Sequence, residues 1–299
     1  MTVRNRVWDT QAGPGFVSWQ TEFPDTLGVQ YPGPGTFGTH TSDLCISGGS
    51  AVIEGPAALL DESFSPNALY LLDGSLAEET GGGPTQFATT GVEQYTTGPV
   101  PGTQAILFNG GTKHQGNAAD PNVGAVRITG DLTVEALVRF PTAPPYAIEV
   151  MATCEGGTAG INDNNGLWSF IVTNSGPIHF QGYEWTLNQF VGISVPAALG
   201  NLFDGNWHHM LYTRDISGGP GSVIMRCWID GIMVFEDTAI AQVPYTGTSA
   251  AFLTIGGNPF TTDYAPANSE MSSLKIIPRV LTQAEIIAEY KRWLPEAQR

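Results

Sequence analysis

Two segments of the sequence combine aromatic rings with amide and carboxylate groups, which are the side chains that bind sugars. The first holds Tyr183, Trp185 and Asn188, and the second holds Asp263 and Tyr264. An aromatic face packs under the C–H groups of a sugar, while amides and carboxylates hydrogen-bond to its hydroxyl groups. We therefore predict a carbohydrate-binding site at these positions. The alternative, that the aromatic rings belong to the core or to a subunit contact, stays open.

Carboxylate pairs for glycosidic hydrolysis are not found at a suitable spacing. Such enzymes hold two carboxylates about 5–5.5 Å apart for retention of configuration, and further apart for inversion. Asp131 and Glu135 share one face of an expected strand, but the rise per residue separates them by about 13 Å. Glu236 and Asp237 are adjacent and face opposite ways. We therefore predict no catalytic residues.

The adjacent pair His208–His209 suggests metal binding, but its expected position on a strand argues against it. Neighbouring strand residues point to opposite faces, so the two imidazoles cannot share one ion without a bulge. Residues 162–166 read Asn-Asp-Asn-Asn-Gly and offer oxygen ligands for calcium. They lack the downstream bidentate glutamate of an EF-hand loop. We predict no metal or cofactor, and leave calcium at Asp163 and Asn165 open.

The composition excludes several classes of function. The 299 residues include 12 Lys and Arg against 28 Asp and Glu, which gives a formal net charge of −16, and 41% are hydrophobic. An acidic chain repels phosphates, which argues against nucleic acids and anionic membrane surfaces as partners. The most apolar stretch, 223–235, is interrupted by Arg226 and Asp230, so we expect no membrane insertion.

The N-terminus and the cysteines indicate where the chain is made. The first residues, Met-Thr-Val-Arg-Asn-Arg-Val-Trp, lack the apolar stretch of a secretory signal peptide. Cys45, Cys154 and Cys227 are odd in number, widely spaced and form no metal or redox motif. We expect free buried thiols in a protein made in a reducing cytoplasm, which does not fix where it acts.

Residues 1–60 differ from the rest of the chain. They hold 14 Gly or Pro residues and little sustained periodicity, so we predict an irregular arm rather than a regular sheet. An ordered arm needs contacts, and we expect its aromatic residues to pack on neighbouring subunits. These candidate assembly residues are Trp8, Phe16, Trp19, Phe23, Tyr31 and Phe37.

Alternation of apolar and polar residues predicts many strands after residue 61. Apolar residues occupy every second position from 132 to 140, the period of a half-buried strand. Strands at 206–214 and 222–230 follow, and Asp230–Gly231 is a tight-turn dipeptide that predicts a hairpin with 232–236. Short strands without interleaved helices favour an antiparallel β-sandwich. Further strands are expected at 68–72, 105–108, 147–153, 167–173, 178–181 and 252–255.

One helix is predicted near the C-terminus. Thr282 and Glu285 have the spacing of a capping box, and Leu281 and Ile286 that of a hydrophobic staple. The apolar residues that follow have helical spacing and predict a stripe that docks onto the sandwich. This stripe consists of Ile286, Ile287, Tyr290, Trp293 and Leu294.

Six segments follow one another along the chain: Gln104–Gly110, Leu132–Arg139, Asp204–His209, Trp228–Gly231, Leu253–Gly257 and Arg279–Ile286. In this order they resemble the laminin-G-like branch of the concanavalin A-like lectin/glucanase jelly rolls. Leu137 stands where that branch has Trp. The resemblance implies an all-β fold: an antiparallel β-sandwich jelly roll over residues 61–299, with the irregular arm at 1–60 and one C-terminal helix.

The resemblance leaves the function open, and the lack of a catalytic motif favours a recognition protein over an enzyme. Such jelly rolls serve as lectins, adhesion modules, virion proteins and glycosidases, so the fold alone does not decide. The glucanases of the superfamily place their carboxylates as E-x-D-x-x-E or E-x-D-x-E, and this sequence has no such run. We expect a component of a phage or viral virion (capsid decoration, head fibre or tail-associated adhesin) that displays a jelly roll on the virion surface. Residues 1–60 would attach it to other virion subunits.

Two alternative functions stay open. In the first the chain is a free-standing carbohydrate-binding module, and in the second it is a polysaccharide-degrading enzyme with an unrecognised site. The expected partners are virion or assembly subunits and glycans of a cell surface or the environment, with homo-oligomerisation left open.

Overall fold

The computed structural model describes residues 66–140, 149–155, 167–173, 178–184, 189–196, 202–219, 222–240, 251–259 and 262–293, and short strands at 7–8, 17–18, 44–47 and 50–53. The chain forms two compact units, Met1–Asp61 and Glu62–Arg299.

Among its described residues, the first unit contains two small antiparallel sheets, each of two short strands. Strand β1 (Val7–Trp8) pairs with β2 (Val17–Ser18), and β3 (Leu44–Ser47) pairs with β4 (Ser50–Ile53). The sequence between β3 and β4 is Gly48–Gly49, a dipeptide that favours tight hairpins, and both strands contain β-branched residues. The side chains of the six aromatic arm residues lie outside the described part of the chain.

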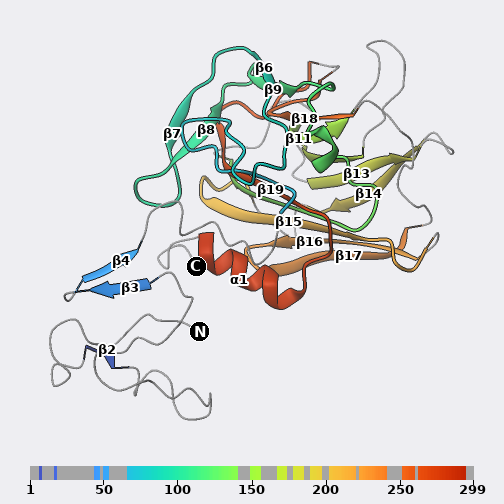
Figure 1. Cartoon of the computed structure of the whole chain (residues 1–299). Helices are drawn as coiled ribbons and strands as arrows, with labels where there is room; N and C mark the ends of the chain where they lie inside the picture. Colours follow the sequence, from blue (N-terminus) through green and yellow to red (C-terminus); the bar gives the residue numbers. More distant parts are fainter. Residues whose placement is uncertain are drawn as a thin grey trace. The chain divides into compact units, whose positions relative to one another are not determined.

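An eight-stranded antiparallel sheet forms one layer of the second unit, and the order of its strands is β17-β16-β15-β10-β19-β8-β7, with β5 also paired to β19 (Figure 1). Its strands are β5 (Ala68–Tyr70), β7 (Tyr95–Thr97), β8 (Gln104–Phe108), β10 (Leu132–Arg139), β15 (Trp207–Asp215), β16 (Val223–Ile229), β17 (Ile232–Ile240) and β19 (Ser269–Ile277).

A seven-stranded antiparallel sheet forms the other layer, in the order β14-β13-β12-β11-β18-β9-β6. Its strands are β6 (Phe87–Thr90), β9 (Lys113–Gly116), β11 (Glu149–Glu155), β12 (Trp168–Val172), β13 (Ile178–Glu184), β14 (Gln189–Val195) and β18 (Phe252–Ile255). A short 3₁₀ helix (Val123–Ala125) precedes β10, and helix α1 (Gln283–Trp293) follows β19.

The hydrophobic core lies between the two sheets. Tyr212 of β15 stacks on Phe180 of β13 with ring centroids 4.3 Å apart, and it contacts Phe170 of β12 at 5.8 Å. The two sheets therefore pack face to face through alternate residues of their strands, and the predicted all-β sandwich with one C-terminal helix is confirmed.

Strand β10 is buried on both faces, which corrects the expectation of a half-buried strand. Val134 and Val138 lie in the inter-sheet core, as the alternation predicts. Glu135 and Leu137, on the opposite face, are 1% and 0% exposed. Helix α1 lies on this side of the eight-stranded sheet, away from the other layer (Figure 1), and its contacts there bury residues that simple alternation leaves in solvent.

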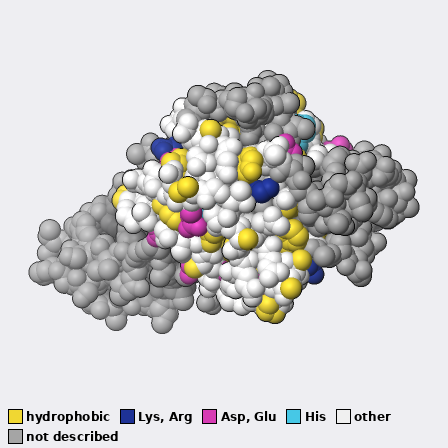
Figure 2. Space-filling view, turned by 90° about the horizontal axis from the view of Figure 1, so that it is seen from above, with side chains coloured by type: hydrophobic (Ala, Val, Ile, Leu, Met, Phe, Trp, Pro, Cys, Tyr) yellow, Lys and Arg dark blue, Asp and Glu magenta, His cyan; other side chains and the backbone are white. Residues whose placement is uncertain are grey.

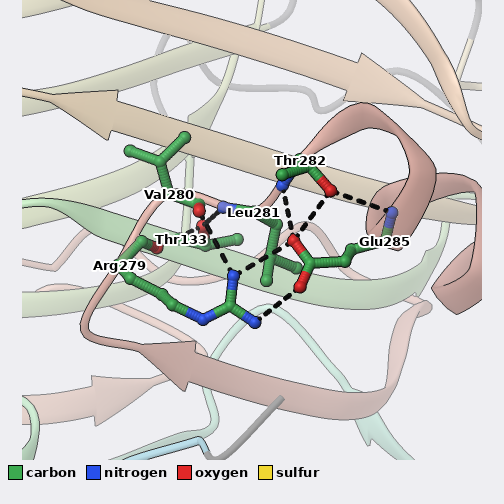
Figure 3. Close-up of polar contacts among 6 residues, drawn as sticks. All are labelled: Thr133, Arg279, Val280, Leu281, Thr282 and Glu285. Carbon is green, nitrogen blue, oxygen red and sulfur yellow. Dashed lines mark hydrogen bonds and ion pairs between the residues drawn. The ribbon is translucent and has the colours of Figure 1, made fainter. Parts of the chain in front are cut away.

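The predicted capping box is confirmed and extends into a larger network (Figure 3). The Thr282 amide donates to Glu285 Oε2 at 2.7 Å, and the Glu285 amide donates to Thr282 Oγ1 at 3.4 Å. Arg279 donates to both Glu285 carboxylate oxygens, at 3.1 and 2.8 Å. Thr133 of β10 donates to the Arg279 carbonyl at 2.7 Å and accepts from the Leu281 amide at 3.1 Å. This network fixes where α1 begins relative to β10.

The buried stripe of α1 differs from the predicted one. Ile286 and Trp293 are buried as expected, and Ile286 packs with Leu281 in one cluster. The third buried residue is Glu289, whereas Ile287 and Tyr290 are only half-buried. Glu289 is buried because Lys275 of β19 supplies a cation beneath the helix, at 2.5 Å. Leu294 lies outside the described residues.

Substitution of Glu285 by alanine is expected to destabilise the domain by about 1–2 kcal/mol, because it removes the cap and the bidentate partner of Arg279. Hydrogen bonds from Arg279, with those from Thr282, overcome the effect of burial and hold the pKa of Glu285 at about 2. Its contribution is therefore present above the unfolded pKa of about 4.5 and is lost as the pH falls through 2. Urea unfolding at pH 7 and at pH 2.5 measures this, with Gln283→Ala as the control in the same turn. An equal loss for both variants at pH 7 would contradict the prediction.

Candidate functional site

A row of small, uncharged side chains crosses the face of the seven-stranded sheet that points away from the core. Directly opposed residues of an antiparallel pair share a face, and the pairing continues over all seven strands. Thr153 and Ser169 are hydrogen-bonded to each other at 2.7 Å, and the middle of the row is buried while its ends are accessible. The row consists of Ala88, Gln115, Thr254, Thr153, Ser169, Gln181 and Gly192.

A depression of about 490 Å³ lies where this row reaches β6 and β9. No residue that lines it carries a charge, and its accessible lining is more apolar than polar. Figure 2, a view of the β6, β9 and β18 side, likewise shows mostly uncharged atoms with few charged side chains on the described part of the surface. The lining residues are Gln86, Phe87, Ala88, Gln115, Gly116, Asn117, Ala118 and Phe252.

The amides of the depression are arranged to leave hydrogen-bonding groups accessible. Asn117 Nδ2 donates to Gln86 Oε1 at 3.2 Å, and Asn117 Oδ1 accepts from the Ala119 amide at 2.8 Å. Both amide oxygens are thereby engaged, and the Gln86 amide N–H groups remain. Among the described residues, none pairs with the side-chain amide of Gln115, which offers a donor and an acceptor together.

Asp120 fixes the loops that form the rim of the depression. Its Oδ2 accepts from the Thr85 and Gln86 amides at 2.9 and 3.0 Å, and its Oδ1 accepts from the Asn122 amide at 2.8 Å. Burial raises the pKa of Asp120, but these three backbone donors outweigh it and lower the pKa overall. The carboxylate therefore stays ionised and holds residues 85–86 against residues 117–122, so the lining is preorganised.

Close strand packing shapes the base of the depression. A Cβ atom added at Gly116 would lie 2.7 Å from the Leu253 carbonyl oxygen, so only glycine lets β9 approach β18 this closely. Phe87 is held by an edge-to-face contact with Tyr70, with ring centroids 5.8 Å apart. The Tyr70 hydroxyl in turn donates to the Pro84 carbonyl at 2.8 Å.

The predicted residues Asp263 and Tyr264 lie beside the same strand as Gln115. Lys113 of β9 places its ammonium 5.3 Å from the Tyr264 ring centroid and donates to the Asn258 carbonyl at 2.7 Å. The Asn258 amide donates to the Asp263 carbonyl at 2.8 Å. Burial lowers the pKa of Lys113, with partial compensation from Asp263. The structure thus brings Asp263 and Tyr264 together at a short distance along β9 from the depression.

The remaining predicted sugar-binding residues are not tested. Tyr183 belongs to β13, where it pairs with Phe190 of β14. Trp185 and Asn188 lie outside the described residues, as do Asp163 and Asn165 of the calcium-like loop. Sequence reasoning missed Gln86, Gln115 and Asn117. Their signal was weak, because isolated amide residues beside turns are common and only the pairing of β6, β9 and β18 brings them together.

His208 and His209 point to opposite faces of the sheet, as the alternation predicts. His208 Nδ1 and Nε2 contact Asp230 at 2.8 Å and Asp204 at 3.0 Å. Burial lowers the pKa of His208, but these two aspartates more than offset it and raise the pKa overall. His209 lies under α1, with Nε2 3.4 Å from Glu135 Oε1. The two histidines therefore make separate contacts on opposite faces of the sheet.

Three further features of the described residues bear on function. No group of three or more His, Cys, Asp or Glu side chains there is placed to hold a metal ion. Cys154 and Cys227 are buried thiols that form no disulfide among the described residues, and burial raises the pKa of Cys227 to about 12. No helix among them has the length and apolar character to cross a membrane.

The comparison with known families agrees with this architecture. A laminin-G-type model described as the concanavalin A-like lectin/glucanases superfamily matches residues 109–287. The chain belongs to this superfamily. Residues of the matching segments contact one another. Asp230, in the turn between β16 and β17, accepts from the His209 amide at 2.9 Å, and Thr133 donates to the Arg279 carbonyl. These two contacts give residues of the matching segments a structural role.

Solved structures share the fold at low sequence identity. The receptor-binding domain of botulinum neurotoxin C/D mosaic serotype matches with a TM-score of 0.57 and 14% identity over 76% of this chain. The binding domain of Paraclostridial Mosquitocidal Protein 1 matches at 0.53 and 12% over 75%. A structure of botulinum neurotoxin type C, whose uptake into cells depends on two ganglioside molecules, matches at 0.54 and 13% over 76%.

The chain spans about half the length of these solved structures, covering 51% of each. No curated protein matches the sequence. At these identities the likeness shows the fold alone.

Proposed function

We propose that this domain of the concanavalin A-like superfamily recognises glycans without catalysis, and that the depression between β6, β9 and β18 is its binding site. The observation that carries the proposal is the lining itself: an apolar base with three amide side chains and no charge. Binding sites for small ligands combine largely apolar walls with a few well-placed polar groups. The superfamily membership and the receptor-binding and ganglioside-dependent proteins of the same fold support it.

The geometry suits one or two sugar rings. The amide of Gln115 can donate to one hydroxyl and accept from its neighbour, while Gln86 donates from the opposite side. Phe87 and Phe252 provide apolar surface for the C–H face of a sugar. Because Asp120 holds the loops in place, little ordering is required on binding, which favours affinity.

The test is binding to a glycan panel by the full chain and by two variants. Gln115→Ala removes a neutral hydrogen-bonding group worth about 1 kcal/mol and is expected to weaken binding about fivefold. Ala88→Trp fills the depression and is expected to abolish binding. The control is Gln283→Ala, an exposed glutamine on α1. Unchanged affinity of both pocket variants, with the domain folded, would contradict this site.

We further propose that the chain displays this domain on a virion surface through residues 1–60. The separation of Met1–Asp61 from Glu62–Arg299 as compact units supports an arm that acts apart from the jelly roll. Deletion of residues 1–60 should leave a domain with unchanged unfolding temperature that no longer joins its assembly. A truncated chain that still incorporates would contradict an attachment role. Incubation with polysaccharides should release no reducing ends or unsaturated products; their release would favour the enzyme alternative.

A further inference from the structure

We infer that the depression between β6, β9 and β18 selects uncharged glycans and rejects those with carboxylate or sulfate groups. The inference rests on the proposed function and specifies its ligand class. Two observations carry it: the lining has no charged group, and the two cations beside it are committed to the protein's own carbonyl oxygens.

Arg127 is the first of these cations, and it lies behind the wall of the depression. Its Nε donates to the Ala251 carbonyl at 2.5 Å, next to Phe252, and its Nη2 donates to the Ala118 carbonyl at 3.3 Å. Both acceptors adjoin or belong to the lining. The guanidinium thus holds the wall together, and a ligand anion would have to compete with these backbone acceptors for it.

Lys113 is the second cation, two residues before Gln115 on β9. The residue is 7% exposed, and its ammonium is committed to the Asn258 carbonyl and lies over the Tyr264 ring. A buried ammonium with these partners cannot turn outward without leaving them unpaired. It is therefore withheld from a ligand in the depression.

An anionic group in this depression would lose water without gaining a cation. Removing a charged group from water is costly unless it is paired and hydrogen-bonded, and amide N–H groups alone compensate only in part. The Asp120 carboxylate at the rim has both oxygens occupied by backbone amides, and its negative charge adds repulsion. The formal net charge of −16 adds a weaker, salt-dependent repulsion.

Neutral sugars meet none of these penalties. Hydroxyl and acetamido groups of a sugar both donate and accept hydrogen bonds. The accessible Gln115 amide also donates and accepts, and the Gln86 amide donates. The site is thus complementary to neutral ligands in polarity as well as in charge.

The experiment compares matched neutral and acidic ligands by calorimetric titration of the full chain: lactose with 3′-sialyllactose, and α-1,4-linked galactotriose with trigalacturonate. We expect the neutral member of the bound pair to bind at least tenfold more tightly. Gln115→Lys places a cation in the depression and should bring the acidic member to within threefold of the neutral one, in a salt-dependent manner. The matched control, Gln115→Met, has similar length without charge and should weaken neutral binding without gain for the acidic ligand.

Each outcome of this experiment either supports or overturns the selectivity for uncharged glycans. Equal or tighter binding of the acidic member by the unaltered chain overturns the inference, and loss of that binding in Arg127→Gln would show that Arg127 is the anion partner. The proposed function survives that result. Absence of binding to every ligand on the broader panel overturns the proposed function, and this inference with it.

Discussion

Replacement of Arg214 by methionine is expected to lower the free energy of unfolding by about 4 kcal/mol or more. Arg214 is 2% exposed, and it makes four hydrogen bonds of 2.7–3.1 Å to the carbonyl oxygens of Ile128, Gly130 and Leu167. Methionine fills much of the volume but leaves three carbonyls without these donors, at about 1–3 kcal/mol each. Since Leu167 directly precedes β12 and Arg214 belongs to β15, the variant also loses a link between the two sheets.

Burial lowers the pKa of Arg214 to about 10, with partial compensation from Asp131, so the guanidinium stays charged at neutral pH. Urea unfolding at pH 7 measures the loss. The control is Arg226→Met on the adjacent strand β16, whose partly exposed pair with Glu236 should contribute at most about 1 kcal/mol. Similar losses of unfolding free energy in the two variants would show that the hydrogen bonds from Arg214 to buried carbonyls contribute no more than a partly exposed ion pair.

Replacement of Lys275 by methionine is expected to cost about 3–5 kcal/mol at pH 8, the range for breaking a buried ion pair. Its ammonium lies 2.5 Å from Glu289 Oε2 and 3.5 Å from Glu135 Oε1, and all three residues are at most 2% exposed. His209 faces Glu135, while Trp293 and Arg292 face Glu289. Without Lys275, two carboxylates under α1 lack their shared cation.

The same cluster makes stability depend on pH. Burial, then repulsion by Glu135, raises the pKa of Glu289 to about 7 against the attraction of Lys275, so folding favours the protonated form. Its stabilising contribution is complete below the unfolded pKa of about 4.5 and is lost as the pH rises to 7. Glu135 behaves in the opposite sense: Lys275 and His209 outweigh its burial and lower its pKa to about 2, so its contribution appears above 4.5.

Unfolding of Lys275→Met at pH 5 and pH 8 tests this arrangement, because protonation of the orphaned carboxylates at pH 5 should recover part of the loss. Lys291→Met, an exposed lysine of α1, is the control. Glu289→Gln should remove the decline in stability that Glu289 causes between pH 4.5 and 7. A Lys275→Met loss that does not change with pH would contradict the protonation of these carboxylates.

The sequence predicted the parts of the fold that rest on local patterns. The Thr282–Glu285 cap, the Asp230–Gly231 hairpin and the apolar face of β10 depend on residues close together in the chain. Burial of Glu289 was not predictable in this way, because it depends on Lys275 and Glu135 from two other elements.

The candidate site illustrates the same limit. Gln86 and Gln115 lie 29 positions apart, and Phe252 comes from a third strand, so only sheet pairing brings them together. Asp263 and Tyr264 were recognised from their residue types, but their position beside Lys113 follows from a close approach of β9 to Gly257 and to residues 263–264.

The order of the strands has a consequence for synthesis on the ribosome. In the eight-stranded sheet, β19 lies between β10 and β8, and in the other sheet β18 lies between β11 and β9. Both inserted strands come after residue 250, so a nascent chain has made most of its strands before either sheet can become continuous. Until then β8, β9, β10 and β11 expose unpaired edges, which are templates for aggregation. Neither sheet of this domain is therefore expected to become continuous until the segment beyond residue 250 has been made.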